Sequence, residues 1–166
     1  DRQNYHVRWD PQKDLEKVPE DGIYTYRILA EDGTGNVSQS SGQIILSNLT
    51  IEILEHSSTP SHISPQNRDG QFDQTSITYN LSKNAIVTVK VFDYQDNLIK
   101  TLVDGIQQEA GAQSVTWDGD KTDGSIISEF EENTYIYVIT AMDPLTSGTV
   151  KASGNIVVDN RLPQAP

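Results

Sequence analysis

The sequence contains no cysteine, and this absence excludes disulfide frameworks, thiolate zinc sites and cysteine nucleophiles together. Basic residues are also scarce, since 12 Lys and Arg stand against 24 Asp and Glu in 166 residues. The formal net charge is therefore −12, and the clustered cations that grip a phosphate backbone or an anionic membrane are missing. No apolar run is long enough to cross a bilayer as a helix. These absences argue against a nucleic-acid partner and against insertion into a membrane.

The apolar residues that are present alternate with polar ones. In the stretch 85–92, Val87, Val89 and Val91 fall on one face, and polar side chains fall between them. This period of two is typical of an antiparallel strand with one buried face. Three shorter stretches alternate in the same way: 77–81, 114–117 and 135–141. Because Asp-Gly and Asn-containing turns separate the stretches, the pattern predicts an all-β chain folded as an antiparallel sandwich.

Three motifs occur twice in the same order, which predicts a tandem repeat. The matches are Trp9-Asp10 with Trp117-Asp118, residues 24–32 with 135–143, and residues 42–48 with 154–160. We therefore expect residues 49–160 to form one complete module and residues 1–48 to form the C-terminal part of another. Within the complete module, residues 49–54 are predicted to open the sandwich and residues 55–62 to be a solvated Ser/Thr/Pro linker. The Pro-containing tail 161–166 is interpreted as a linker between domains.

Several segments of the complete module resemble one family when they are taken in order. They are the Ser64-Pro65 loop with Asp69-Gly70, the hairpin around 87–102, the Trp117-Asp118-Gly119 strand end and the Tyr135-x-Tyr137 strand. Together they resemble bacterial Ig-like (fibronectin-III-like) modules of the flagellar hook-capping protein type, which occur in secreted and cell-surface multidomain proteins. The resemblance implies an Ig-like β-sandwich, here one complete module preceded by a partial one.

The resemblance also implies a class of function. We expect a non-catalytic spacer or adhesion module of a bacterial surface or secreted protein, located outside the cell or on its surface, with the periplasm as the alternative. Two other roles stay open: an accessory C-terminal region of a secreted protease or glycosidase, and a flagellar hook-cap or periplasmic assembly scaffold. An enzyme is not expected, because the sequence has neither a His-Glu-x-x-His motif nor a Gly-x-Ser-x-Gly motif.

Calcium is the one cofactor that the sequence suggests, and otherwise no cofactor is expected. Asn67, Asp69 and Asp73 are spaced like part of an EF-type loop, with Gly70 at the position of the invariant glycine. Pro65 and Ser76 stand where that loop needs its first and last carboxylate ligands. The alternative interpretation is an ordinary Asp-Gly turn.

Six aromatic residues are predicted to be core markers and not sugar-stacking platforms, because large aromatics dominate core burial. They are Trp117, Tyr135 and Tyr137, with their repeat counterparts Trp9, Tyr24 and Tyr26. A partial module must cover its apolar face with something else. We therefore expect residues 1–48 to be completed by other modules of the same chain or by another chain. A protein or carbohydrate on a surface is the further partner class considered.

Overall fold

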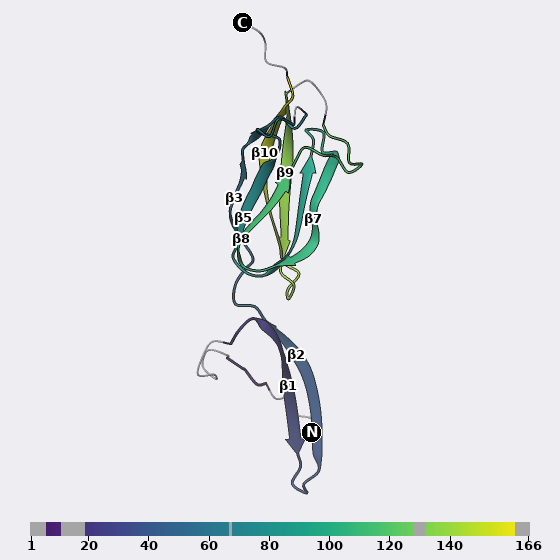
Figure 1. The fold of residues 1–166 in the computed structure, drawn as a ribbon. Helices are drawn as coiled ribbons and strands as arrows, with labels where there is room; N and C mark the ends of the chain where they lie inside the picture. The colour runs from purple at the N-terminus through teal and green to yellow at the C-terminus, as the bar shows by residue number, and fades with distance from the viewer. Residues whose placement is uncertain (1–5, 11–18, 67, 128–131, 162–166) are drawn as a thin grey trace. The chain divides into compact units, whose positions relative to one another are not determined.

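The computed structural model describes residues 6–10, 19–66, 68–127 and 132–161, and the regular structure of these residues consists of β-strands. The chain divides into two compact units, Asp1–Asn48 and Leu49–Pro166 (Figure 1). The all-β sandwich expected from the alternating pattern, and the Ig-like fold implied by the resemblance, are confirmed.

The first unit is built on one antiparallel hairpin. Strand β1 (Gly22–Glu31) pairs with β2 (Val37–Leu46) from Gly22 opposite Leu46 to Glu31 opposite Val37. The turn begins at Asp32, whose carboxylate accepts hydrogen bonds from the backbone N–H groups of Thr34 and Asn36, both at 2.9 Å. Such Asx turns reverse the chain locally, so the hairpin is specified by nearby residues.

The second unit is a sandwich of two sheets. The larger sheet has the order β4-β10-β9-β6-β7, formed by β4 (His62–Ile63), β10 (Thr149–Asp159), β9 (Glu132–Met142), β6 (Ala85–Phe92) and β7 (Leu98–Gln108). The smaller sheet has the order β3-β5-β8, formed by β3 (Ile53–Thr59), β5 (Thr75–Leu81) and β8 (Gly111–Trp117). Neighbouring strands are antiparallel except β4 and β10, which pair in parallel.

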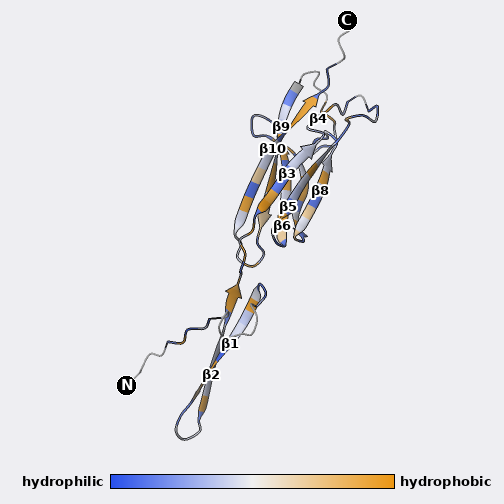
Figure 2. Cartoon of the chain, turned by 90° about the vertical axis from the view of Figure 1, so that its left-hand side faces the viewer, coloured by the Kyte–Doolittle hydropathy of each residue, from blue (hydrophilic) through white to orange (hydrophobic). Residues whose placement is uncertain are grey.

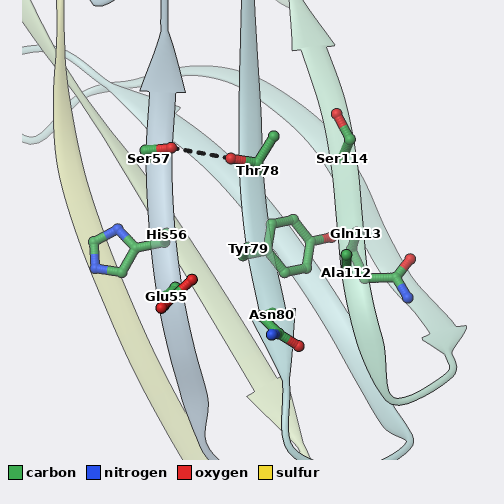
Figure 3. Close-up of a pocket in the computed structure, with 9 residues that line it drawn as sticks. All are labelled: Glu55, His56, Ser57, Thr78, Tyr79, Asn80, Ala112, Gln113 and Ser114. Atoms are coloured by element: carbon green, nitrogen blue, oxygen red, sulfur yellow. Dashed lines mark hydrogen bonds between the residues drawn. The ribbon is translucent and has the colours of Figure 1, made fainter.

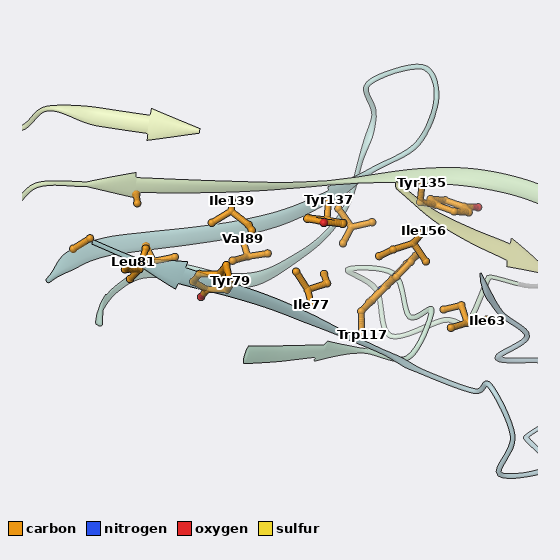
Figure 4. Close-up of a cluster of buried hydrophobic side chains, with 14 of the residues drawn as sticks. Ile63, Ile77, Tyr79, Leu81, Val89, Trp117, Tyr135, Tyr137, Ile139 and Ile156 are labelled. Carbon is orange, nitrogen blue, oxygen red and sulfur yellow. The ribbon is translucent and has the colours of Figure 1, made fainter. Parts of the chain in front are cut away.

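The core lies between these two sheets, and the period-two pattern supplies it. Every second residue of β6 is buried, and Val87, Val89 and Val91 have no exposed surface. Strand β5 contributes Ile77, Tyr79 and Leu81 from the opposite layer, each at most 2% exposed (Figure 4). Burial of alternating branched side chains from both layers is what holds an aligned sandwich together.

One strand prediction was wrong at the start of the second unit. Residues 49–54 were expected to open the sandwich and residues 55–62 to be a solvated linker. The first strand instead begins at Ile53, because residues 53–59 form β3 and residues 62–63 form β4. The strand was missed because Ser57-Ser58-Thr59 is a polar run. Such a run is tolerated here, since β3 is an edge strand that pairs with β5 alone. Its outward positions need no apolar side chain, so the alternation that marks a half-buried strand is weak there.

Candidate functional site

A groove on the outer face of the three-stranded sheet is the first candidate site. Its volume is about 580 Å³, and it is lined by Glu55, His56, Ser57, Thr78, Tyr79, Asn80, Ala112, Gln113 and Ser114 (Figure 3). The hydroxyl groups pair across the strands: Ser57 Oγ lies 3.0 Å from Thr78 Oγ1, and Ser76 Oγ lies 2.8 Å from Ser114 Oγ. The groove therefore combines apolar surface with hydroxyl and amide groups and with the carboxylate of Glu55.

The groove does not assemble a nucleophile with a base. His56 and Ser57 are consecutive residues of β3, so their side chains leave opposite faces of the sheet. The Nδ1 atom of His56 lies 3.0 Å from the Oη of Tyr137, and the two rings meet edge to face at 5.9 Å. The hydroxyl of Tyr79 donates to Oε1 of Gln108 at 2.8 Å, and burial raises the pKa of this tyrosine. These polar groups are engaged in structural contacts.

The residues predicted to bind calcium lie in a turn-rich loop. The carboxylate of Asp69 accepts from the N–H of Gln71 at 2.8 Å, and that of Asp73 accepts from the N–H of Gly70 at 2.9 Å. The second oxygen of Asp73 is buried and has no hydrogen-bond partner among the described residues. Asn67 lies outside the described residues. Within the described part of the chain no three His, Asp or Glu residues come together as a metal site, and the calcium site stays a prediction.

Much of the acidic charge sits at the start of turns. Asp93 accepts hydrogen bonds from the side chain of Asn97 and from backbone N–H groups, and these lower its pKa. Ser125 does the same for Asp123 through its hydroxyl and its N–H. The pKa of Asp32 is likewise held below its usual range, above all by the side chain of Asn36. These carboxylates stay ionised because they cap turns, and they need no catalytic role to explain them.

The six aromatic markers divide between the two units. Trp117, Tyr135 and Tyr137 are at most 6% exposed, and the rings of Trp117 and Tyr135 pack at 5.6 Å. In the first unit, Trp9 is 39% exposed and Tyr26 is 44% exposed, while Tyr24 is half-buried. The expectation that Trp9 and Tyr26 lie in a core is therefore corrected. The described residues of the first unit hold only a two-stranded sheet, with no second layer to cover them.

The two hairpins nevertheless share their register. Tyr26 lies opposite Gly42 in the first unit, as Tyr137 lies opposite Gly154 in the second. In both hairpins the tyrosine ring covers the glycine so closely that a Cβ atom there would lie 2.5 Å from the ring's Cζ. The pairs match at every position along these strands, as the predicted tandem repeat requires.

An asparagine at the end of each hairpin makes a hydrogen bond to the chain that enters the hairpin. We call this contact the asparagine brace, and the repeated sequence motifs did not predict it. Asn160 is 5% exposed and donates from Nδ2 to the carbonyl of Ile127 at 2.9 Å. Asn48 donates from Nδ2 to the carbonyl of Pro19, also at 2.9 Å. Both asparagines close matched motifs, residues 42–48 and 154–160, and that recurrence was the available signal. The brace fixes the chain that enters each hairpin to the end of its second strand.

Comparison with known proteins agrees with this geometry. Residues 64–129 match the family model of the FlgD Ig-like domain. The second unit therefore resembles Ig-like modules of the flagellar hook-capping type, as the sequence motifs predicted. No curated protein matches the chain.

Solved structures also match the chain. Dimeric latent PorU from Porphyromonas gingivalis is 13% identical, with a TM-score of 0.52 over 87% of this chain and 13% of that chain. FlgD from P. aeruginosa is 24% identical, with a TM-score of 0.42 over 51% of this chain and 61% of that chain. The chain thus spans less than two thirds of either protein. In the described residues no helix is long and apolar enough to cross a membrane.

Proposed function

We propose that this chain is a non-catalytic spacer in a bacterial surface or secreted multidomain protein, acting outside the cell or in the periplasm. The observation that supports this most is the repeated hairpin, with the same register, the same Tyr-on-Gly contact and the same asparagine brace in both units. A chain that repeats structure while its polar groups serve turns and strand pairing is suited to separating other domains.

The charge of the chain supports the same role. A net charge of −12 favours solubility and opposes close association between neighbouring modules. The most exposed sheet edges of a sandwich are also the places where chains aggregate, and like charge is one means of preventing that. A spacer benefits from both effects because it must stay folded and unpaired over its length.

An adhesive role is the alternative that the groove offers, and a glycan array distinguishes it from a spacer. We expect the full 166-residue chain to bind no glycan above background. Binding in the micromolar range that is lost in Thr78→Arg would contradict the spacer role and assign adhesion to the groove. Thr149→Arg is the matched control, because Thr149 is also exposed but lies outside the groove.

One observation favours a second role as an accessory region of a larger protein. The likeness to PorU covers 87% of this chain but only 13% of that chain, so this fold occurs as a small part of a much longer polypeptide. Sequencing the complete reading frame distinguishes the roles. A catalytic motif elsewhere in it would favour the accessory role, and further Ig-like repeats would favour the spacer.

A further inference from the structure

The first unit presents an apolar sheet face whose counterpart in the second unit is buried. We call it the open face, defined by Tyr24, Tyr26, Ile28 and, across the hairpin, Ile44. Ile28 is 59% exposed, Tyr26 is 44% exposed and Ile44 is 36% exposed. The matching residues of β9 and β10, which include Ile139, are at most 6% exposed. In Figure 2 the C-terminal end of β2, where Ile44 and Ile45 lie, is coloured as hydrophobic.

The same hairpin also has an open edge. In the second unit, β9 lies between two partners, with β10 on one side and β6 on the other. In the first unit, β1 pairs with β2 along its whole length, and its other edge meets no strand among the described residues. An unpaired strand edge beside an exposed apolar face is the arrangement that strand addition completes.

We propose that β1 and the open face are a docking site for one antiparallel β-strand with the chemistry of β6, supplied by a polypeptide segment outside residues 1–166. The repeat gives its register. Val91, Val89 and Val87 of β6 lie opposite Tyr137, Ile139 and Ala141 of β9. The added strand therefore places small branched apolar residues opposite Tyr26, Ile28 and Ala30, with polar residues between them.

The hairpin is already shaped for this partner. The Asp32 turn, the packing of Tyr26 on Gly42 and the brace from Asn48 are all formed within the first unit. A preformed acceptor loses little conformational entropy on binding, which favours affinity. A second copy of the chain is the weaker occupant, because two chains that each carry −12 repel one another.

The test uses the full chain and a labelled peptide with the sequence of residues 84–93, which contains β6. Fluorescence anisotropy measures binding, and hydrogen exchange shows which amides the peptide protects. We expect saturable binding with new protection in β1. The matched peptide carries Val89→Pro, which removes a backbone donor and an inward side chain, and it should not bind.

Two chain variants separate the open face from the reverse face of the same strand. Ile28→Asp places a charge on the open face, while Leu29→Asp changes an equally exposed residue on the opposite face, where Leu29 is 63% exposed. We expect Ile28→Asp to weaken peptide binding by about tenfold or more, since burying a charge opposes docking, and Leu29→Asp to change it little.

Three outcomes would overturn the proposal. The first is an absence of protection in β1, and the second is an equal loss of peptide affinity in the two variants. The third is a dimer of the chain alone that the Ile28→Asp substitution abolishes and that the peptide does not dissociate. Analytical ultracentrifugation detects the dimer. Because both substituted side chains are exposed, the circular dichroism of the full chain should be unchanged in both variants, and hydrogen exchange of the paired β1–β2 amides verifies that the hairpin of the first unit still forms.

Discussion

We expect the substitution Gly154→Ala, which adds one methyl group against the ring of Tyr137, to lower the unfolding free energy of the second unit. A Cβ atom at position 154 would lie 2.5 Å from Cζ and 2.7 Å from Cε1 of Tyr137. The ring cannot move away into solvent, because Tyr137 is 2% exposed and its hydroxyl lies 3.0 Å from Nδ1 of His56. Gly154→Ala must therefore displace a buried ring and break this hydrogen bond.

The magnitude follows from three contributions. Overpacking a core costs about 1–3 kcal/mol. Losing the hydrogen bond between Tyr137 and His56 costs about 0.5–1.5 kcal/mol. Replacing a strand glycine by alanine returns about 0.5–1 kcal/mol, because the unfolded chain loses freedom. The expected net loss is about 2 kcal/mol of unfolding free energy, equivalent to a fall of roughly 8 °C in Tm for a unit of this size.

Urea unfolding followed by the emission of Trp117 measures this loss, in a Trp9→Phe background that leaves one tryptophan. The decisive comparison repeats Gly154→Ala in a Tyr137→Ala background, where no ring stands over the glycine. There the substitution should cost nothing or stabilise slightly. An equal cost in both backgrounds would refute the steric reasoning.

The remaining predictions concern the buried ion pair between Lys83 and Asp143 and the loop that contains Asp69 and Asp73. Lys83→Met removes the ammonium 3.1 Å from the Asp143 carboxylate, which is 3% exposed, and should cost the second unit about 3 kcal/mol in urea unfolding; a loss below about 1 kcal/mol would contradict this. Burial alone would raise the pKa of Asp143, but hydrogen bonds from Leu145 and Lys83 hold it at about 2, below the unfolded value of 3.8. The stability that ionised Asp143 contributes is therefore present above pH 3.8 and is lost as the pH falls through about 2. Acid titrations of both proteins should show a smaller loss of stability in Lys83→Met, because that variant lacks the ammonium group that lowers the pKa of Asp143. We expect millimolar Ca²⁺ to leave Tm unchanged, since turn N–H groups engage Asp69 and Asp73; a rise that Asp73→Asn abolishes would establish the calcium site.

The sequence predicted the interior strands of the second unit well, because burial leaves a period of two in their residues. The stretch 85–92 coincides with β6, and 135–141 falls within β9. Edge positions were harder to predict, as β3 shows. Its polar residues pair across strands through hydroxyl groups such as those of Ser57 and Thr78, and this contact leaves no apolar alternation.

The groove was beyond sequence reasoning for a different reason. Ser57, Thr78 and Ser114 lie on three strands that are far apart in the chain, and only the pairing register of β3, β5 and β8 brings them together. The burial of Tyr26 could not be judged from its own strand either. A tyrosine on the inward face of a repeat becomes core only when a second sheet covers it, and alternation does not report whether that sheet is present.

The contacts shared by the two hairpins explain why one repeat can lack a core and keep its form. The Asx turn at Asp32, the packing of Tyr26 on Gly42 and the link from Asn48 to Pro19 all join residues within one unit. They fix register and shape, which depend on geometry. They add little burial, and a two-stranded hairpin without a packed face is only marginally stable in water. In the second unit that burial comes from β6 and the opposing sheet. Form and stability thus have separate sources in this fold. The first unit holds the contacts that set its form, but the burial that would stabilise it requires a partner on its open face.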